Sequence, residues 1–307
     1  PEGDDVYTTL GATTSEDLNA LAPPVAHPVM EHITEADPTL DNDLNDWRAG
    51  HGARPRLSVL GPIHARVGAG GNPLAAAKRR AYYTELLAYL WTQPHGATTA
   101  QVTEALGITE DRARRDLSKL REWLGTNPIS GQPHLPTARK SRTGQLLGVG
   151  VYEVNDLLVD ADLFKRLRTR ALARGEAGIT DLEAALSLVE GIPFTDVRPT
   201  GGAWVVDTGL PQHLTCAIVD TAHLVSVHAL AHNDTNLAQW AADIANRAAP
   251  DELIPQLDLA ATAQAMGQPA AALRLVQEAL DPDPDEAPIE PSHRTSQVLT
   301  NRRWNTA

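Results

Sequence analysis

Apolar side chains recur along the chain with two different periods, and stretches without a period separate them. Residues 56–62 alternate between polar and apolar side chains and then reach a turn, which predicts a short strand. From residue 74 to residue 92 the apolar positions follow helical spacing, and Pro94 and Gly96 end this predicted helix. Residues 1–50 follow neither period, so we interpret them as linker.

The next stretch predicts two helices joined by a tight turn. Thr98 is followed three residues later by Gln101, which is the arrangement of a capping box at the start of a helix. Gly107 breaks this short helix, Thr109 offers a second N-cap, and Gly125 is a natural stop for the second helix. A short helix, a glycine turn and a second helix are typical of a helix-turn-helix.

The second predicted helix has a buried face and a charged face. Its apolar positions form one stripe at i, i+4, i+7 and i+11: Ala113, Leu117, Leu120 and Leu124. Its outward residues are basic or small and polar: Arg112, Arg115 and Lys119, flanked by Arg114, Ser118 and Arg121. A helix in a DNA major groove needs such a face, so we predict that it contacts DNA. The alternative is a solvated face whose cations pair with Asp111, Asp116 and Glu122.

Residues 138–154 are interpreted as a β-hairpin with a basic tip. A hairpin that follows a recognition helix is the wing of a winged helix. We predict that the tip residues Arg139, Lys140 and Arg142 contact backbone phosphates, and the alternative is a mobile charged loop. The basic cluster at residues 78–80 has the same two interpretations, phosphate contact or a solvated helix start.

From residue 155 onward the chain is rich in alanine and helical in pattern. Predicted helices span residues 160–174, 179–190, 210–231, 235–248, 251–266 and 269–280. Residues 267–280 have small residues and leucines at the spacing that half of a tetratricopeptide-type (TPR-like) unit needs. This pattern predicts a helical-repeat domain that binds other proteins.

These elements predict a mainly α protein with a small β wing, in which a winged helix-turn-helix precedes a TPR-like α-helical repeat domain. We expect an acidic flexible linker or arm at residues 1–53, in which residues 40–48 can form one short helical turn. The winged helix-turn-helix is placed at residues 54–155, the helical domain at 156–280, and an acidic, proline-rich tail or linker at 281–307.

The charge distribution supports a local nucleic-acid surface in a protein whose net charge is −13. Residues 1–50 hold 11 acids and one base, and residues 151–307 hold 22 acids and 11 bases. Residues 51–150 hold 14 bases and 6 acids, a net of +8. An asymmetry of this kind is typical of one DNA-binding patch. An alternative role for the acidic arm is competition with DNA for this patch.

The sequence gives little support for a membrane span, a disulfide, an enzyme or a metal site. We see neither an apolar run of 18 residues nor a leader, and a single cysteine, Cys216, so we expect a cytoplasmic protein without disulfides. We find no P-loop and no G-x-G-x-x-G, and we predict neither an enzyme nor a cofactor. His228 and His232 have the i, i+4 spacing of zinc ligands but lack the glutamate of a zincin, so we interpret them as a polar helix face and predict no metal.

Several stretches carry a resemblance to a known family. Residues 56–62 look like its opening strand, and residues 113–125, which end Leu-Arg-Glu-Trp-Leu-Gly, look like its recognition helix. Residues 158–164 look like the start of its second domain, and residues 182–194, followed by Trp204, look like the signature of that domain, with valine where tryptophan is common. Over about residues 55–280 the chain resembles the antibiotic-regulatory activators of actinobacteria, which pair a winged helix with a bacterial transcriptional activator domain (BTAD).

The resemblance implies a transcription regulator that binds double-stranded DNA and contacts other proteins, RNA polymerase among them, through its helical domain. Related activator domains also occur inside larger proteins, and the chain begins at Pro1, so we expect further domains of the same polypeptide. The alternative function is a protein–protein interaction or scaffold module of a larger, membrane-anchored signalling protein, in which the winged helix does not bind DNA.

Overall fold

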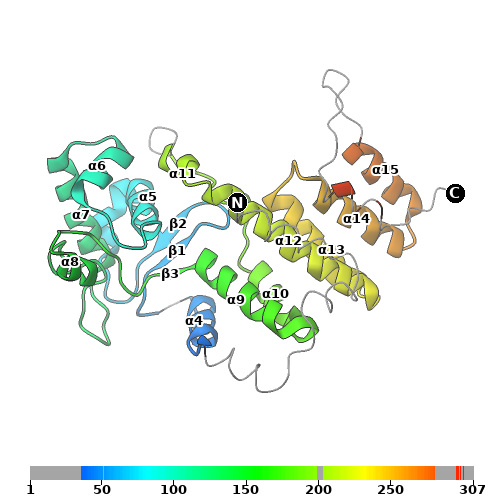
Figure 1. The fold of residues 1–307 in the computed structure, drawn as a ribbon, viewed down its shortest axis with the longest axis horizontal. Helices are drawn as coiled ribbons and strands as arrows, with labels where there is room; N and C mark the ends of the chain where they lie inside the picture. The colour runs from blue at the N-terminus through cyan, green and yellow to red at the C-terminus, as the bar shows by residue number, and fades with distance from the viewer. Residues whose placement is uncertain are drawn as a thin grey trace. The chain divides into compact units, whose positions relative to one another are not determined.

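The computed structural model describes residues 36–50, 52–198 and 203–280, together with residues 295, 296, 298 and 300. The described residues are mainly helical and include one small three-stranded sheet (Figure 1). Residues 1–35 of the predicted arm lie outside the described residues, as does most of the predicted tail over residues 281–307.

The chain divides into two compact units, and neither is continuous in sequence. One, here called the sheet unit, comprises Thr39–Leu163 and Pro193–Leu214, and the other, the helical unit, comprises Pro1–Pro38, Phe164–Ile192 and Thr215–Ala307. This division differs from the predicted boundary at residues 155 and 156, because it places residues 193–214 with the sheet.

The sheet is centred on β1 (Arg56–Ser58), as the alternating pattern of residues 56–62 predicts. β1 pairs antiparallel with β2 (His64–Arg66) and parallel with β3 (Leu158–Val159). Just beyond β1, the buried carboxylate of Asp160 accepts the backbone N–H groups of Val59 at 2.9 Å and Leu60 at 3.0 Å. The Asp160 carboxylate thus takes the place of a neighbouring strand as the hydrogen-bond partner of these two backbone N–H groups.

The helices of the sheet unit begin and end at the predicted signals. The predicted helix over residues 74–92 is a 3₁₀ turn, η1 (Pro73–Arg79), followed by α5 (Arg80–Trp91). α6 (Thr99–Leu106) carries the predicted capping box, with Thr98 and Gln101 bonded to each other's backbone amides. Gly107 takes a left-handed φ of 60° after α6, which lets the chain turn into α7 (Glu110–Leu124) without a steric cost.

A helix, α4 (Leu40–Arg48), corrects part of the prediction for the N-terminal arm. Its residues Leu40 and Leu44 are buried, and the carbonyl oxygen of Trp47 accepts a hydrogen bond of 2.8 Å from Arg56 of β1. Arg54 forms an ion pair with Asp43. Residues 40–48 are therefore a packed helix of the sheet unit, over the same segment for which the sequence predicts a helical turn.

The predicted wing is wrong, because a short helix, α8 (Arg142–Leu147), occupies the centre of residues 138–154. The Ser141 hydroxyl accepts the Gly144 N–H at 3.0 Å, and the Glu153 carboxylate accepts the Thr143 N–H at 3.1 Å. Gly148 then ends the helix with a left-handed φ of 67°. These caps stabilise a helical turn inside the segment that was interpreted as a hairpin.

Aromatic packing explains why residues 193–214 belong to the sheet unit. Phe194 stacks on Trp91 with ring centroids 6.5 Å apart, and Trp204 of α11 (Ala203–Asp207) meets Tyr89 edge to face at 5.5 Å. The backbone N–H of Ile63 also donates to the Thr195 carbonyl oxygen at 2.8 Å. Large aromatic side chains bury enough apolar area to fix such a distant segment.

The helical unit contains the helices predicted from residue 160 onward. They are α9 (Asp160–Arg174) and α12 (Leu210–Ala231), which both begin in the sheet unit, and α10 (Ile179–Leu186), α13 (Thr235–Ala248), α14 (Leu253–Ala265) and α15 (Pro269–Leu280). A 3₁₀ turn, η2 (Gly175–Gly178), joins α9 to α10. Along the chain, α13 packs on α14 and α14 packs on α15. The buried face of α13 is largely alanine, which allows close approach of helices.

Of the described helices, only α12 is long and apolar enough to cross a membrane by length and composition. Of its most apolar window, 67% is buried within the protein, as in the core helix of a soluble protein. Asp220 and His223 are among its buried residues. The helix is therefore weak evidence for a membrane span.

Candidate nucleic-acid interface

Helix α7 is amphipathic in the way that the sequence predicts. The stripe Ala113, Leu117, Leu120 and Leu124 is fully buried, and Trp123 joins it. The residues predicted to contact DNA lie on the remaining surface and are all exposed: Arg112, Arg114, Arg115, Ser118 and Lys119. The helix thus buries its apolar stripe in the sheet unit and leaves its polar surface open to solvent.

A buried carboxylate, Asp116, anchors α7 to α5 and η1. It accepts hydrogen bonds from the Tyr82 hydroxyl at 2.7 Å and the Tyr83 hydroxyl at 3.3 Å. It also receives Arg79 at 3.1 Å and pairs with Arg112 at 3.5 Å. Burial, together with Asp116, raises the pKa of Tyr82, so this phenol stays protonated and donates. The sequence analysis listed Asp116 only as a surface partner and missed this central role.

Arginines surround the Tyr82 ring and leave positive charge at the rim of this cluster. The guanidinium of Arg79 lies 4.1 Å from the ring centroid, and that of Arg198 lies 4.7 Å from it. Arg198 also forms a 2.5 Å hydrogen bond with the buried carboxylate of Glu85. The carboxylates of Asp116 and Glu85 therefore lie among three guanidinium groups, those of Arg79, Arg112 and Arg198. Arg79 acts here as a packing residue, which neither interpretation of residues 78–80 anticipated.

Most cations of the exposed face have acidic neighbours on the same helix. Arg114 lies 2.5 Å from Glu110 and 3.6 Å from Asp111, and Lys119 lies 2.6 Å from Glu122. These pairs match the alternative of a solvated, paired face. Exposed pairs of this kind contribute only about 0–1 kcal/mol each, so a phosphate can replace the acid at little cost.

Arg115 is the exposed cation of α7 that is best placed for a new contact. Within the described part of the chain it forms no ion pair, and its position on the helix lies between Arg112 and Lys119. Ser118, one turn further along, is exposed as well. An unpaired guanidinium beside a small hydroxyl residue suits the edge of a base pair or a phosphate.

The three cations of the predicted wing are exposed, but no hairpin carries them. Arg139 and Lys140 lie in the turn before α8, and Arg142 is the first residue of α8. The preceding loop is fixed to α7 by Arg121, which donates to the carbonyl oxygens of Leu135 at 2.8 Å and residue 136 at 3.3 Å. Arg121, predicted to flank the DNA-contacting face, therefore positions this loop.

Comparison of the chain with protein-family models and with curated proteins gives no match. The likeness to the antibiotic-regulatory activators therefore rests on the sequence motifs alone.

Proposed function

We propose that the chain is a DNA-binding transcriptional regulator, or the regulatory part of a larger protein, in which α7 enters the major groove. The observation that carries this proposal is the open, basic face of α7, which follows a capped helix and a tight glycine turn. Helix, turn and helix are the parts of a helix-turn-helix, and its second helix is the one that reads DNA.

In this proposal α8 and the turn before it take the place of a winged-helix wing. Arg139, Lys140 and Arg142 then contact phosphates next to the groove, while Arg112, Arg114, Arg115, Ser118 and Lys119 face it. Every phosphate neutralised adds about 0.9 to the slope of log affinity against log salt, so binding is strong only at low ionic strength.

The helical unit supplies protein contacts in the same proposal. Helices α13, α14 and α15 pack as sequence neighbours, which supports a TPR-like repeat arrangement. Stacked helices of this type bind peptides and partner proteins, and RNA polymerase is the partner that the sequence resemblance implies.

Titration of fluorescent mixed-sequence duplexes with the full chain at low salt tests DNA binding. We expect Arg115→Ala and Arg139→Ala each to weaken binding several-fold and to reduce the salt slope by about one unit. Arg274→Ala is the control, because Arg274 is an exposed arginine of the helical unit, outside α7 and the turn before α8. Absence of binding at micromolar protein, or equal binding by all variants, contradicts the proposal.

A second function is favoured by exposed leucines on α8. Leu146 and Leu147 are 77% and 63% exposed, and neighbouring Val149 is 52% exposed. Apolar side chains at such positions favour a protein partner, as in an interaction or scaffold module of a larger protein. If the folded chain does not bind DNA in the titration above, this function is the better one.

A further inference from the structure

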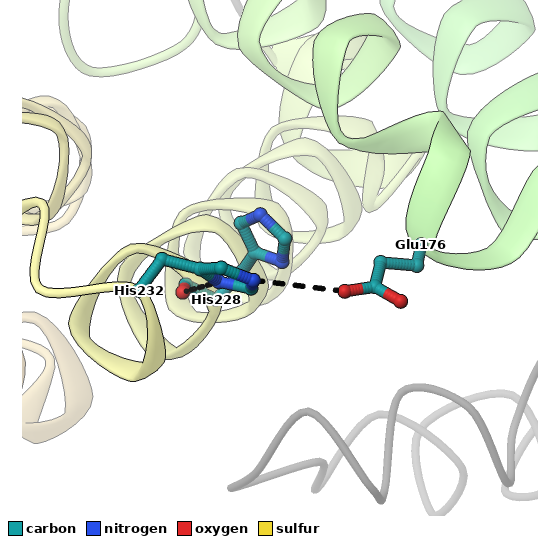
Figure 2. A group of neighbouring side chains, drawn as sticks. All are labelled: Glu176, His228 and His232. Carbon is teal, nitrogen blue, oxygen red and sulfur yellow. Dashed lines mark hydrogen bonds and ion pairs between the residues drawn. The ribbon is translucent and has the colours of Figure 1, made fainter.

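Three metal-ligating side chains meet in the helical unit although they are distant in sequence. His228 and His232 lie one turn apart at the end of α12, with ring centroids 4.3 Å apart. Glu176 of η2 points toward them, and its Oε1 lies 3.8 Å from the Nε2 of His232 (Figure 2). One ligand atom from each residue lies within 4.8 Å of the others.

The hydrogen bonding of His232 fixes which of its nitrogens is free. Its Nδ1 lies 2.9 Å from the carbonyl oxygen of His228. A carbonyl only accepts, so in the neutral ring, the form that binds metal, Nδ1 carries the proton and Nε2 has the lone pair. A carbonyl bound to the far nitrogen of an imidazole is the arrangement that orients histidines toward metal ions.

The atoms that face each other across this cluster are therefore both acceptors. In that neutral form the Nε2 lone pair of His232 faces the Glu176 carboxylate at 3.8 Å, beyond hydrogen-bonding distance. The cluster also lies at the C-terminal end of α12, where the helix dipole favours positive charge. A bound cation would accept both lone pairs and would supply the positive charge that the end of the helix favours.

We propose that Glu176, His228 and His232 bind a divalent transition-metal ion, with zinc as the ion that fits best. Two imidazoles and one carboxylate favour zinc over magnesium or calcium, which prefer oxygen ligands. A tetrahedral zinc ion with bonds of about 2.0–2.2 Å places neighbouring ligand atoms about 3.3–3.6 Å apart. The ligand atoms lie within 4.8 Å of one another, and small rotations of Glu176 and His232 bring them to this shorter separation. Both side chains can rotate, because they are 51% and 52% exposed.

Three protein ligands leave the fourth position of a tetrahedral ion to water or to an outside ligand. The ion would also join η2 to the end of α12, two segments more than 50 residues apart in sequence.

Calorimetric titration of the chelator-treated full chain with zinc chloride tests the site. We expect saturation at one ion per chain and a rise of the melting temperature with zinc. Glu176→Gln and His232→Ala should each weaken binding by more than about tenfold, because loss of an outer-shell partner alone costs 10–100-fold. Both side chains are half exposed, so these variants should fold normally, and circular dichroism without metal verifies this.

Two matched variants control for unrelated sites. His213→Ala removes an exposed histidine at the other end of α12, and Glu190→Gln neutralises an exposed acid after α10. Both should bind zinc like the parent chain. The proposal is overturned if zinc does not saturate the chain by about 1 mM, or if the control and cluster variants bind equally well. Glu176, His228 and His232 belong to the helical unit and α7 to the sheet unit, so zinc and DNA binding can fail independently.

Discussion

Two carboxylates of this protein, Asp116 and Glu176, both lie beside basic side chains but in opposite states of hydrogen bonding. Asp116 is buried and receives donors from two tyrosines and two arginines. Glu176 is half exposed and faces the lone pair of a histidine nitrogen. A carboxylate whose acceptor sites are filled holds a fold together, whereas one that faces a second acceptor is suited to binding a cation.

The largest loss of stability should come from removing the carboxylate of Asp116, whose acceptor sites are filled. Asp116→Ala leaves two buried tyrosine hydroxyls and two arginines without their partner. We expect a loss of about 3 kcal/mol in the free energy of unfolding, the low end for a broken buried pair, because Arg79 and Arg112 remain partly hydrated. Urea unfolding of the full chain measures it.

Asp111→Ala is the control for this variant, because Asp111 is an exposed acid on the same helix, 3.6 Å from Arg114. Its loss should cost less than about 1 kcal/mol. Equal destabilisation by the two variants would show that Asp116 is not an anchor.

The next effect should appear only when zinc is present. Without metal, Glu176→Gln should change the free energy of unfolding by less than about 0.5 kcal/mol, as for a surface substitution. With zinc at 100 times its dissociation constant, the parent chain should gain about 2.7 kcal/mol and the variant almost nothing. Thermal unfolding with and without zinc measures both values. A metal-independent loss in the variant would make Glu176 a structural residue like Asp116.

A smaller effect should follow from removing one donor to Asp116. Tyr82→Phe keeps the ring under Arg79 and Arg198 but removes the 2.7 Å hydrogen bond. We expect a loss of about 1.5 kcal/mol. Tyr83→Phe, whose bond is 3.3 Å long, should lose less. The reverse order in urea unfolding would contradict the assignment of Tyr82 as the main donor.

The smallest effect should come from the ion pairs on the open face of α7. A double-mutant cycle on Lys119 and Glu122 should give a coupling of about 0.2–1 kcal/mol, because both side chains are half exposed. Raising the salt concentration should reduce it further. A coupling above about 2 kcal/mol would mean that this face is held in a fixed ionic network, which disfavours exchange of Glu122 for a phosphate.

Features encoded by neighbouring residues were predictable from the sequence. The capping box of Thr98 and Gln101, the turn at Gly107 and the buried stripe of α7 each depend on residues within a few turns. The alanine-rich helices followed from their spacing in the same way. The buried face of α7 was therefore predictable from the sequence. The hydrogen bonds from two tyrosines to Asp116 were not, because these tyrosines lie more than 30 residues earlier.

Features that depend on distant side chains escaped the sequence analysis. The cap that turns residues 142–147 into a helix includes Glu153, ten residues after Thr143. Residues 193–214 join the sheet unit through Phe194 and Trp204, which pack on aromatic residues of α5. The sequence has no glutamate next to His228, but the turn after α9 brings the distant Glu176 to the two histidines.

The carboxylate of Asp160 gives the chain a built-in reporter for hydrogen exchange. The amides of Val59 and Leu60 are protected by this side chain, about 100 residues away in sequence. Their exchange with deuterium therefore follows the departure of the first residue of α9 from the end of β1, not only the opening of a strand pair. Two amides just beyond an N-terminal strand thus record local unfolding at the start of a helix far along the chain.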